Sequence, residues 1–470
     1  MGFISGYDVV IDRATGRLDL TIGYVVAGAY YPEIGEFGEY LYSSDWTGTY
    51  VEETVPGQRL FQGGRYQELE GNATAGPMAL GLDPNPAGPR TYLLSFYAVE
   101  STGDSSDDVM QYFQVQSAAY LTSGVTLVGR DSPDGVFPSS DILIGGSGAD
   151  LLQGLADDDL LDGGAGNDRL EGGDGDDVLD GGDGRDVLVG GAGDDVYIAE
   201  FGDTFVELPG GGNDRVETYA NAMTLGDNVE TLVRLGSASF RGTGSATANT
   251  IIGGSGIDIL DGAAGNDVLQ GGAGNDTLVG GFGSDVLDGG DGFDTADYSA
   301  SNRGLSVNLA LDIVSGGQAT GDTLIGIEAI RGTAFRDILR GDGAINAIYG
   351  NDGDDDIRGG GGNDVLVGGA GIDWLAGEAG NDRLTGGADT DVFLFGGNGG
   401  RDFITDFGAG AASGDLIRIG PGLAFDTFEQ IMAVTAQQGA DTIIRFDASN
   451  SVTLQGVTMT DLNAGDFLFI

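Results

Sequence analysis

The residues with the clearest potential for chemistry are aspartates that recur every nine positions. Between Gly145 and Ile198 the chain reads as six consecutive nonapeptides: GGSGADLLQ, GLADDDLLD, GGAGNDRLE, GGDGDDVLD, GGDGRDVLV and GGAGDDVYI. Five more fill residues 253–297, from GGSGIDILD to GGDGFDTAD, and seven fill residues 332–394, from GTAFRDILR to GGADTDVFL. Carboxylate and backbone carbonyl oxygens are the ligands that Ca²⁺ prefers. The spacing therefore predicts an array of calcium sites.

The candidate ligands are the side chains at the sixth position of these 18 nonapeptides. The one copy without an aspartate there is GDGAINAIY, where Asn346 replaces it and a weak or empty site is expected. The predicted metal ligands are Asp150, Asp159, Asp168, Asp177, Asp186, Asp195, Asp258, Asp267, Asp276, Asp285, Asp294, Asp337, Asp355, Asp364, Asp373, Asp382 and Asp391. The neighbouring acids Asp157 and Asp158 are expected to be solvated charges instead.

Each nonapeptide combines a turn with a short strand. Its first six residues are rich in glycine, which reaches positive φ without steric strain and so favours a tight turn. Its last three residues carry a central apolar side chain that is expected to point inward. Two nonapeptides form one coil of 18 residues, and coils stack at ~4.8 Å, the spacing of neighbouring strands. Aspartates two repeats apart therefore form columns, such as Asp150, Asp168 and Asp186 on one side and Asp159, Asp177 and Asp195 on the other.

Stacked carboxylates repel one another unless a cation lies between them. Two unit charges ~4.8 Å apart repel by about 1 kcal/mol in water, and by several-fold more inside a protein. We therefore expect the calcium-free repeats to be disordered and about a dozen calcium ions to fold them, with magnesium a poor substitute. The alternative for the calcium-loaded state is a disordered linker. A linker, however, has no reason to keep an apolar residue in phase over 18 copies.

The repeats resemble the RTX, or haemolysin-type, calcium-binding nonapeptides, written G-G-x-G-x-D-x-U-x. Eleven of the 18 copies keep an unbroken GGxGxD, and the resemblance covers most of residues 145–394. It implies a right-handed parallel β-roll. The segment FGGNGGRDFITDFGAGAASGDLIRI and the ending LNAGDFLFI resemble the C-terminal region of RTX proteins. That likeness implies an uncleaved signal for the type I secretion machinery and calcium-driven folding outside a Gram-negative cell.

The composition excludes several classes of site. The chain has no Cys and no His, so disulfides, thiolate or His-ligated zinc sites and a Ser-His-Asp triad are impossible. The net charge is −54, which argues against binding nucleic acid or anionic membranes. We expect neither an N-terminal signal peptide nor a transmembrane segment.

The chain as a whole is predicted to be all-β. Residues 1–140 hold strands such as RTYLLSFYAVE and are expected to form a β-sandwich or jelly-roll, starting with a hairpin around RATG. The tracts follow at 141–198, 253–297 and 332–394. Between them, residues 199–252 and 298–331 read as β spacers that continue or cap the solenoid. Residues 395–470 read as a C-terminal β cap carrying the secretion signal.

Two functions compete at this stage. The first is a secreted, non-enzymatic calcium-binding protein at the cell surface: a surface-layer, matrix or adhesive component that forms homopolymers or contacts cell-surface polysaccharide. The second is an exported polysaccharide lyase or hydrolase, with the repeats as a folding module. Its candidate carboxylates are Glu33, Glu36, Glu39, Glu52 and Glu53. Most of these are expected to be solvated, so no catalytic residue is assigned. Trp374, at an outward strand position, is expected to contact either the cap or a partner.

Overall fold

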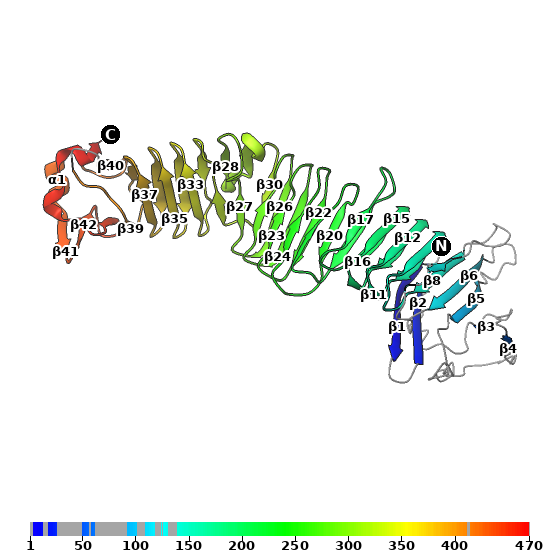
Figure 1. Ribbon diagram of the computed structural model, residues 1–470. Coiled ribbons are helices and arrows are strands. Elements are labelled where there is room, and N and C mark those ends of the chain that lie inside the picture. Colours follow the sequence, from blue (N-terminus) through cyan, green and yellow to red (C-terminus); the bar gives the residue numbers. More distant parts are fainter. Residues whose placement is uncertain are drawn as a thin grey trace. The chain divides into compact units, whose positions relative to one another are not determined.

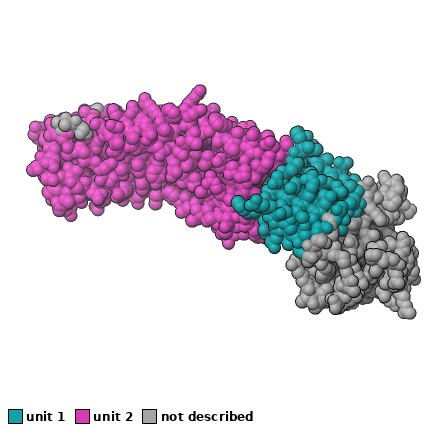
Figure 2. All heavy atoms as spheres, viewed as in Figure 1, with its two compact units in different colours: residues 1–212 teal, residues 213–470 magenta. Residues whose placement is uncertain are grey.

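The chain divides into two compact units, residues 1–212 and residues 213–470 (Figure 2). The structure, a computed structural model, describes the backbone of six strands between residues 3 and 117. It also describes residue 124 and residues 126–129, 139–410 and 414–469. In both units, most of the described strands pair in parallel.

The six N-terminal strands form two groups. β1 (Phe3–Asp12) and β2 (Arg17–Val25) pair as an antiparallel hairpin. The second group runs in the order β4, β3, β5, β6, with antiparallel pairing throughout. Its members are β3 (Thr49–Val55), β4 (Gln58–Phe61), β5 (Tyr92–Glu100) and β6 (Val109–Ser117). The side chains of residues 1–123 lie outside the described part of the chain. The expected sandwich and the roles of the five candidate glutamates therefore stay predictions.

The repeats of residues 1–212 form two parallel stacks of strands. One contains β8 (Ser139–Ile144), β10 (Leu160–Asp162), β13 (Val178–Asp180) and β16 (Val196–Ala199). The other contains β7 (Thr126–Val128), β9 (Leu151–Ala156), β12 (Arg169–Asp174), β15 (Val187–Ala192) and β17 (Thr204–Val206). A further pair, β11 (Ala165–Gly166) and β14 (Asp183–Gly184), lies in the turns. Leu161 pairs with Leu179 and Leu152 with Leu170, so the predicted coil of 18 residues is confirmed.

The first half of residues 213–470 repeats this arrangement. One stack contains β18 (Arg215–Thr218), β20 (Thr231–Arg234), β22 (Thr250–Gly254), β24 (Val268–Gly274), β26 (Val286–Gly292) and β30 (Thr323–Ile325). The facing stack starts with β19 (Ala222–Thr224), β21 (Arg241–Thr243), β23 (Ile259–Asp261), β25 (Thr277–Val279), β27 (Thr295–Asp297) and β31 (Ala329–Arg331). Strands that precede residue 253 are therefore in register with strands of the repeats.

The segment between residues 298 and 331 interrupts one stack but not the other. β28 (Ser306–Asn308) and β29 (Ile313–Ser315) form a small antiparallel hairpin, accompanied by the 3-10 turns η1 (Leu309–Leu311) and η2 (Gly317–Ala319). β30 then returns to pair with β26, and β31 pairs with β27. After its hairpin, this spacer thus contributes one strand to each of the two stacks.

The third tract continues the β31 stack and opens a new one. The β31 stack gains β33 (Ala347–Asp352), β35 (Val365–Ala370), β37 (Arg383–Ala388) and β39 (Arg401–Ile404). The new stack starts from β28 and contains β32 (Ile338–Arg340), β34 (Asp356–Gly361), β36 (Trp374–Ala379), β38 (Val392–Phe395) and β40 (Leu416–Ile419). In Figure 1 these strands follow one another from green through yellow to the orange cap.

The cap ends the solenoid of residues 213–470 with a change from parallel to antiparallel pairing. β43 (Ser451–Leu454) pairs in parallel with β39, whereas β42 (Asp441–Arg445) and β41 (Thr435–Gln438) add antiparallel strands. The helix α1 (Phe428–Ala433), the turns η3 (Met459–Asp461) and η4 (Ala464–Asp466), and β44 (Phe467–Phe469) complete it (Figure 1).

The core consists of the inward apolar side chains, one from each nonapeptide and therefore two in each coil. The inward residues of the nonapeptides are fully buried, and successive coils place them directly above one another, as at Leu260 and Leu278 or Leu366 and Leu384. Each inward side chain therefore packs only against its own and adjacent coils. Among the described residues, the prediction of an all-β, mostly parallel solenoid with little helix is confirmed.

Candidate metal centre

The aspartates at the sixth repeat position form hydrogen-bonded columns along both units. The backbone N–H of most of them donates to Oδ1 of the aspartate 18 residues later, for example from Asp258 to Asp276 at 2.8 Å and from Asp276 to Asp294 at 2.6 Å. The same bond joins Asp150 to Asp168 at 2.7 Å. In these pairs, one carboxylate oxygen of the accepting aspartate is therefore bonded to the preceding coil.

The second carboxylate oxygen has no such partner in most repeats. It is buried, and no donor among the described residues reaches it. This is the state of Oδ2 in Asp159, Asp168, Asp177, Asp186, Asp258, Asp267, Asp276, Asp285, Asp294, Asp355, Asp364, Asp373, Asp382 and Asp391. A buried oxygen without a donor is costly in a folded protein, and most buried polar groups have a partner. A cation would satisfy these oxygens.

Backbone carbonyl oxygens lie beside these carboxylates, in the groove between coils. A Cβ added to Gly271, the first residue of its repeat, would lie 2.4 Å from Asp276 Oδ2 and 2.8 Å from the carbonyl oxygen of Gly289 in the next coil. Gly262 has the same relationship to Asp267 and Gly280. The groove is thus lined by carboxylate and carbonyl oxygens, which is the donor set of Ca²⁺. Glycine is required at the first position because a side chain would fill the groove.

Burial raises the pKa of these carboxyl groups, and the neighbouring aspartates add to the shift. The pKa of Asp159 rises to about 9, that of Asp177 to about 8 and that of Asp276 to about 6. Without a cation, some of these groups would hold a proton at neutral pH. A bound divalent cation favours the ionised form instead, so binding would release protons.

The structure buries every predicted metal ligand. All 17 aspartates are at most 4% exposed, and all lie in the columns described above. Oδ2 of Asp150 and of Asp337 accepts a hydrogen bond from the N–H of Gly146 and of Thr333, respectively. The column arrangement was therefore foreseen, whereas the assignment of individual ligands stays a prediction.

Asparagine replaces the acid at two sites, and there its side-chain amide forms hydrogen bonds with the groove atoms. Asn249 Oδ1 accepts from the N–H of Ser245, and its Nδ2 donates to the carbonyl oxygen of Val229 at 2.8 Å. Asn346 makes the matching bonds to the N–H of Asp342 and the carbonyl oxygen of Glu328. The neutral amide thus supplies the donor that an aspartate lacks. This supports the expectation of a weak or empty site at Asn346.

Sequence reasoning missed acids outside the nonapeptides that extend the columns. Each accepts the N–H of the last aspartate before it, at 2.9–3.0 Å: Asp203 from Asp186, Asp322 from Asp285, Glu328 from Asp294, Asp402 from Asp382 and Asp415 from Asp391. Their spacings of 17, 37, 34, 20 and 24 residues break the period. The signal that could have found them is an acid two residues before an apolar residue, as in Glu328-Ala-Ile330.

A second ladder runs along the turns at the fifth repeat position. The N–H of Phe293 donates to Asn275 Oδ1, and the N–H of Ser284 donates to Asn266 Oδ1. Asp158 and Asp176 accept the same bond from the following coil. The frequent Asn or Asp at this position is therefore explained by hydrogen bonds between the turns of successive coils. Asp158, expected to be a solvated charge, is exposed but also accepts one of these bonds.

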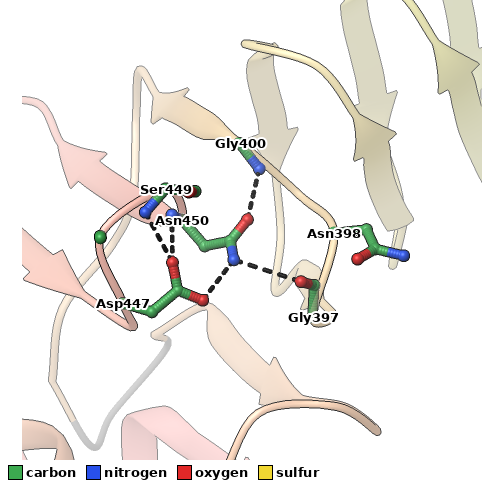
Figure 3. Close-up of a pocket in the computed structure, with 7 residues that line it drawn as sticks. Gly397, Asn398, Gly400, Asp447, Ser449 and Asn450 are labelled. Carbon is green, nitrogen blue, oxygen red and sulfur yellow. Dashed lines mark hydrogen bonds between the residues drawn. The ribbon is translucent and has the colours of Figure 1, made fainter.

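A shallow pocket of about 570 Å³ lies in the cap, where the loop after β38 meets the β42–β43 turn (Figure 3). Asn450 Oδ1 accepts from the N–H of Gly400 at 2.9 Å, and its Nδ2 donates to the carbonyl oxygen of Gly397. Asp447 accepts the N–H groups of Ser449 and Asn450. These bonds fasten the hairpin to the last coil, so the pocket lining is structural.

Trp374 contacts the cap. Its side chain is 41% exposed on β36, and the Arg418 guanidinium carbon on β40 lies 5.0 Å from its ring centroid. Cation–π contacts of this kind stabilise by about 0.5–1 kcal/mol at exposed sites. The expected contact with the C-terminal region is therefore present, and the contact with a partner stays a prediction.

The comparisons with known proteins point to the repeats. The family model described as "RTX calcium-binding nonapeptide repeat (4 copies)" matches overlapping segments within residues 138–206, 243–296 and 331–404. Among solved structures, an extracellular lipase, LipA from Serratia marcescens, is 18% identical with a TM-score of 0.20, over 55% of this chain and 45% of the lipase. The chain thus spans less than half of that lipase. No curated protein matches it. None of the described helices could cross a membrane.

Proposed function

The chain carries RTX calcium-binding nonapeptide repeats between residues 138 and 404, and on that premise we propose that it is a secreted structural protein that calcium folds outside the cell. The observation that carries this proposal is the set of buried Oδ2 atoms without a donor. Each lies in a groove lined by oxygen atoms, and each belongs to a column of like charges. Calcium would convert this repulsion into a bridge between coils.

Folding and calcium binding are then one process. The unfolded chain has no preformed groove, so the free energy of binding becomes free energy of folding. The large negative charge keeps the calcium-free chain expanded and soluble. Such a chain suits export by the type I machinery in an unfolded state, followed by folding where calcium is abundant. The proposed location is therefore the surface of, or the medium outside, a Gram-negative cell.

The proposed role is non-enzymatic, as a surface-layer, matrix or adhesive component. A column of strands is a repetitive, extended scaffold, and solenoid ends favour stacking where they are not capped. Among the described residues, the cap pocket is held together by its own hydrogen bonds. The alternative is an enzyme that acts on polysaccharides through residues 1–140. The experiments below distinguish it from the structural role.

The test compares the full chain in chelator and in calcium. Far-UV circular dichroism should change from coil to β-structure with calcium, and equimolar magnesium should reproduce little of this change. A spectrum that is the same in chelator and calcium would refute calcium-dependent folding. Electron microscopy of the calcium-loaded chain should show ordered assemblies. Turnover of alginate-like or pectin-like glycans by the full chain would instead support the enzymatic alternative.

A further inference from the structure

The spacer between the second and third tracts contains the parts of one more site. We infer that Glu328 and the carbonyl oxygen of Gly326 hold a divalent cation together with Asp294, so that the cation array passes through the spacer. This inference rests on the proposed calcium-dependent folding. Gly326 and Glu328 lie outside the segments that match the repeat family, because those segments end at residue 296 and resume at residue 331.

Two hydrogen bonds of a regular coil recur around Glu328, although its own N–H donates to the carbonyl oxygen of Asp294 at 3.2 Å rather than to a side chain of the next coil. The N–H of Asp294 donates to Glu328 Oε2 at 2.9 Å, as the N–H of Asp276 donates to Asp294 Oδ1 at 2.6 Å. The N–H of Ala329 donates to the carbonyl oxygen of Asp294 at 2.8 Å, and the N–H of Thr295 donates to that of Asp276 at the same distance. Glu328 therefore occupies the sixth position of the next coil, although 34 residues separate it from Asp294.

The groove beside Asp294 has the oxygen lining of a nonapeptide site. A Cβ added to Gly289 would lie 2.6 Å from Asp294 Oδ2 and 2.3 Å from the carbonyl oxygen of Gly326. In the preceding coil, the equivalent neighbours of Gly271 are Asp276 Oδ2 and the carbonyl oxygen of Gly289. Gly326 thus replaces the first glycine of a repeat.

The carboxylate at this groove lacks a partner. Asp294 is fully buried, and no donor among the described residues reaches its Oδ2. Asp294 and Glu328 together carry two negative charges, which a divalent cation balances. The side chain that follows in the column is Asn346, whose Nδ2 donates to the carbonyl oxygen of Glu328. The proposed cation site is therefore followed in the column by Asn346, where the side-chain N–H replaces the cation.

The opposite edge of the same coil is built differently. There Asp322 accepts the N–H of Asp285 on Oδ1, but its Oδ2 accepts the hydroxyl of the buried Tyr298 at 3.1 Å. The three atoms nearest to a Cβ built on Gly280 all belong to the Asp285 side chain, with Oδ2 at 2.5 Å. The inference is therefore confined to the edge formed by Asp294 and Glu328.

The site has a structural consequence for the spacer. The chain leaves the solenoid after β27, forms the β28–β29 hairpin and returns through β30 and β31. A cation between Asp294 and Glu328 fastens the returning chain to the second tract. The returning residues 322–331 should consequently order with calcium, together with the tract that precedes them.

The test uses Glu328→Gln in the full chain, which keeps the size of the side chain and an acceptor for the Asp294 N–H. Calcium per chain, counted by titration calorimetry and by metal analysis after desalting, should fall by one ion. Hydrogen exchange should show loss of calcium-dependent protection in residues 322–331, while residues 253–280 keep theirs. The matched control is Asp312→Asn, an exposed acid in the same spacer, which should bind as many ions as the wild type.

The outcomes separate this inference from the proposed function. A wild-type chain that responds to calcium, with Glu328→Gln unchanged in ion count and protection, would overturn the site alone. A wild-type chain without any calcium response would overturn the proposed function. Should Glu328→Gln not fold, a lanthanide-loaded crystal of the wild-type chain decides. An anomalous peak between Asp294 Oδ2 and the Gly326 carbonyl oxygen supports the site, and an empty groove there contradicts it.

Discussion

The backbone N–H of Asp258 donates a hydrogen bond of 2.8 Å to Oδ1 of Asp276, one coil further along the solenoid. This bond fixes the orientation of the Asp276 carboxylate, and it leaves Oδ2 facing the groove beside Gly271. Because the same bond recurs along each column, every coil orients the side chain of the next one. The columns are therefore cooperative structures, and replacement of one aspartate should destabilise both adjacent coils.

Replacement of Asp276 should have opposite effects with and without calcium. In calcium, Asp276→Ala removes a ligand and the acceptor of the Asp258 N–H, and should lower the free energy of unfolding by about 2 kcal/mol. In chelator, Asp276→Asn should instead increase the residual β-structure, because it removes a buried charge. Urea unfolding in calcium and far-UV circular dichroism in chelator check this, with the exposed Asp291→Asn as control. Equal shifts for Asp276→Ala and Asp291→Asn in calcium would contradict the ligand role.

The pH dependence of the calcium-free chain follows from the raised pKa values. Burial raises the pKa of Asp177 to about 8 and that of Asp364 to about 7, from 3.8. The folded state therefore binds more protons than the unfolded state between about pH 4 and pH 8, so stability in chelator should fall as pH rises. Circular dichroism in chelator should show β-structure near pH 4.5 and its loss by pH 8. More structure at pH 8 than at pH 4.5 would contradict the assigned direction.

Calcium binding should show the opposite preference. Protons compete with the cation for the same carboxylates, so the midpoint of a calcium titration should rise as pH falls below 6. Calorimetry in two buffers of different ionisation enthalpy should also detect proton release at pH 7. Identical heats in both buffers would indicate that the carboxylates are already ionised in the calcium-free chain.

The groove glycines give a steric test. Gly350→Ala would place a Cβ 2.2 Å from Asp355 Oδ2 and 2.7 Å from the carbonyl oxygen of Gly368. Overpacking of this kind costs about 1–3 kcal/mol, and calcium affinity should fall with it. Gly343→Ala is the matched control in the preceding repeat, since a Cβ there meets no atom within 4 Å. Thermal unfolding in calcium should separate the two variants, and equal midpoints would show that the groove tolerates a side chain.

The contact of Trp374 with Arg418 provides a spectroscopic probe. The chain has two tryptophans, so Trp46→Phe leaves the fluorescence of Trp374 alone. Its emission should shift to shorter wavelength as calcium orders the third tract and the cap. Arg418→Gln should lower the stability of the calcium-loaded cap by about 0.5–1 kcal/mol. An emission maximum that is insensitive to calcium would show that this contact forms without the ion.

The sequence by itself determined the coil and its columns. The nonapeptide period places an inward residue such as Leu260 and an aspartate such as Asp258 in the same register in every repeat, and strand spacing then stacks them. Local periodicity is sufficient here because each coil contacts only its neighbours. For the same reason, Asn346 could be recognised in advance as a weak point in the array.

Only the tertiary structure decided what happens where the period fails. Glu328 joins Asp294 across 34 residues, and Asp322 joins Asp285 across 37, because the chain detours through the β28–β29 hairpin before it returns. Such pairings depend on long-range packing, which nearest-neighbour patterns do not contain. The position of Oδ2 relative to a carbonyl oxygen of the next coil also requires coordinates. The repeats thus specify their own local geometry, whereas the continuity of the columns is a property of the folded chain.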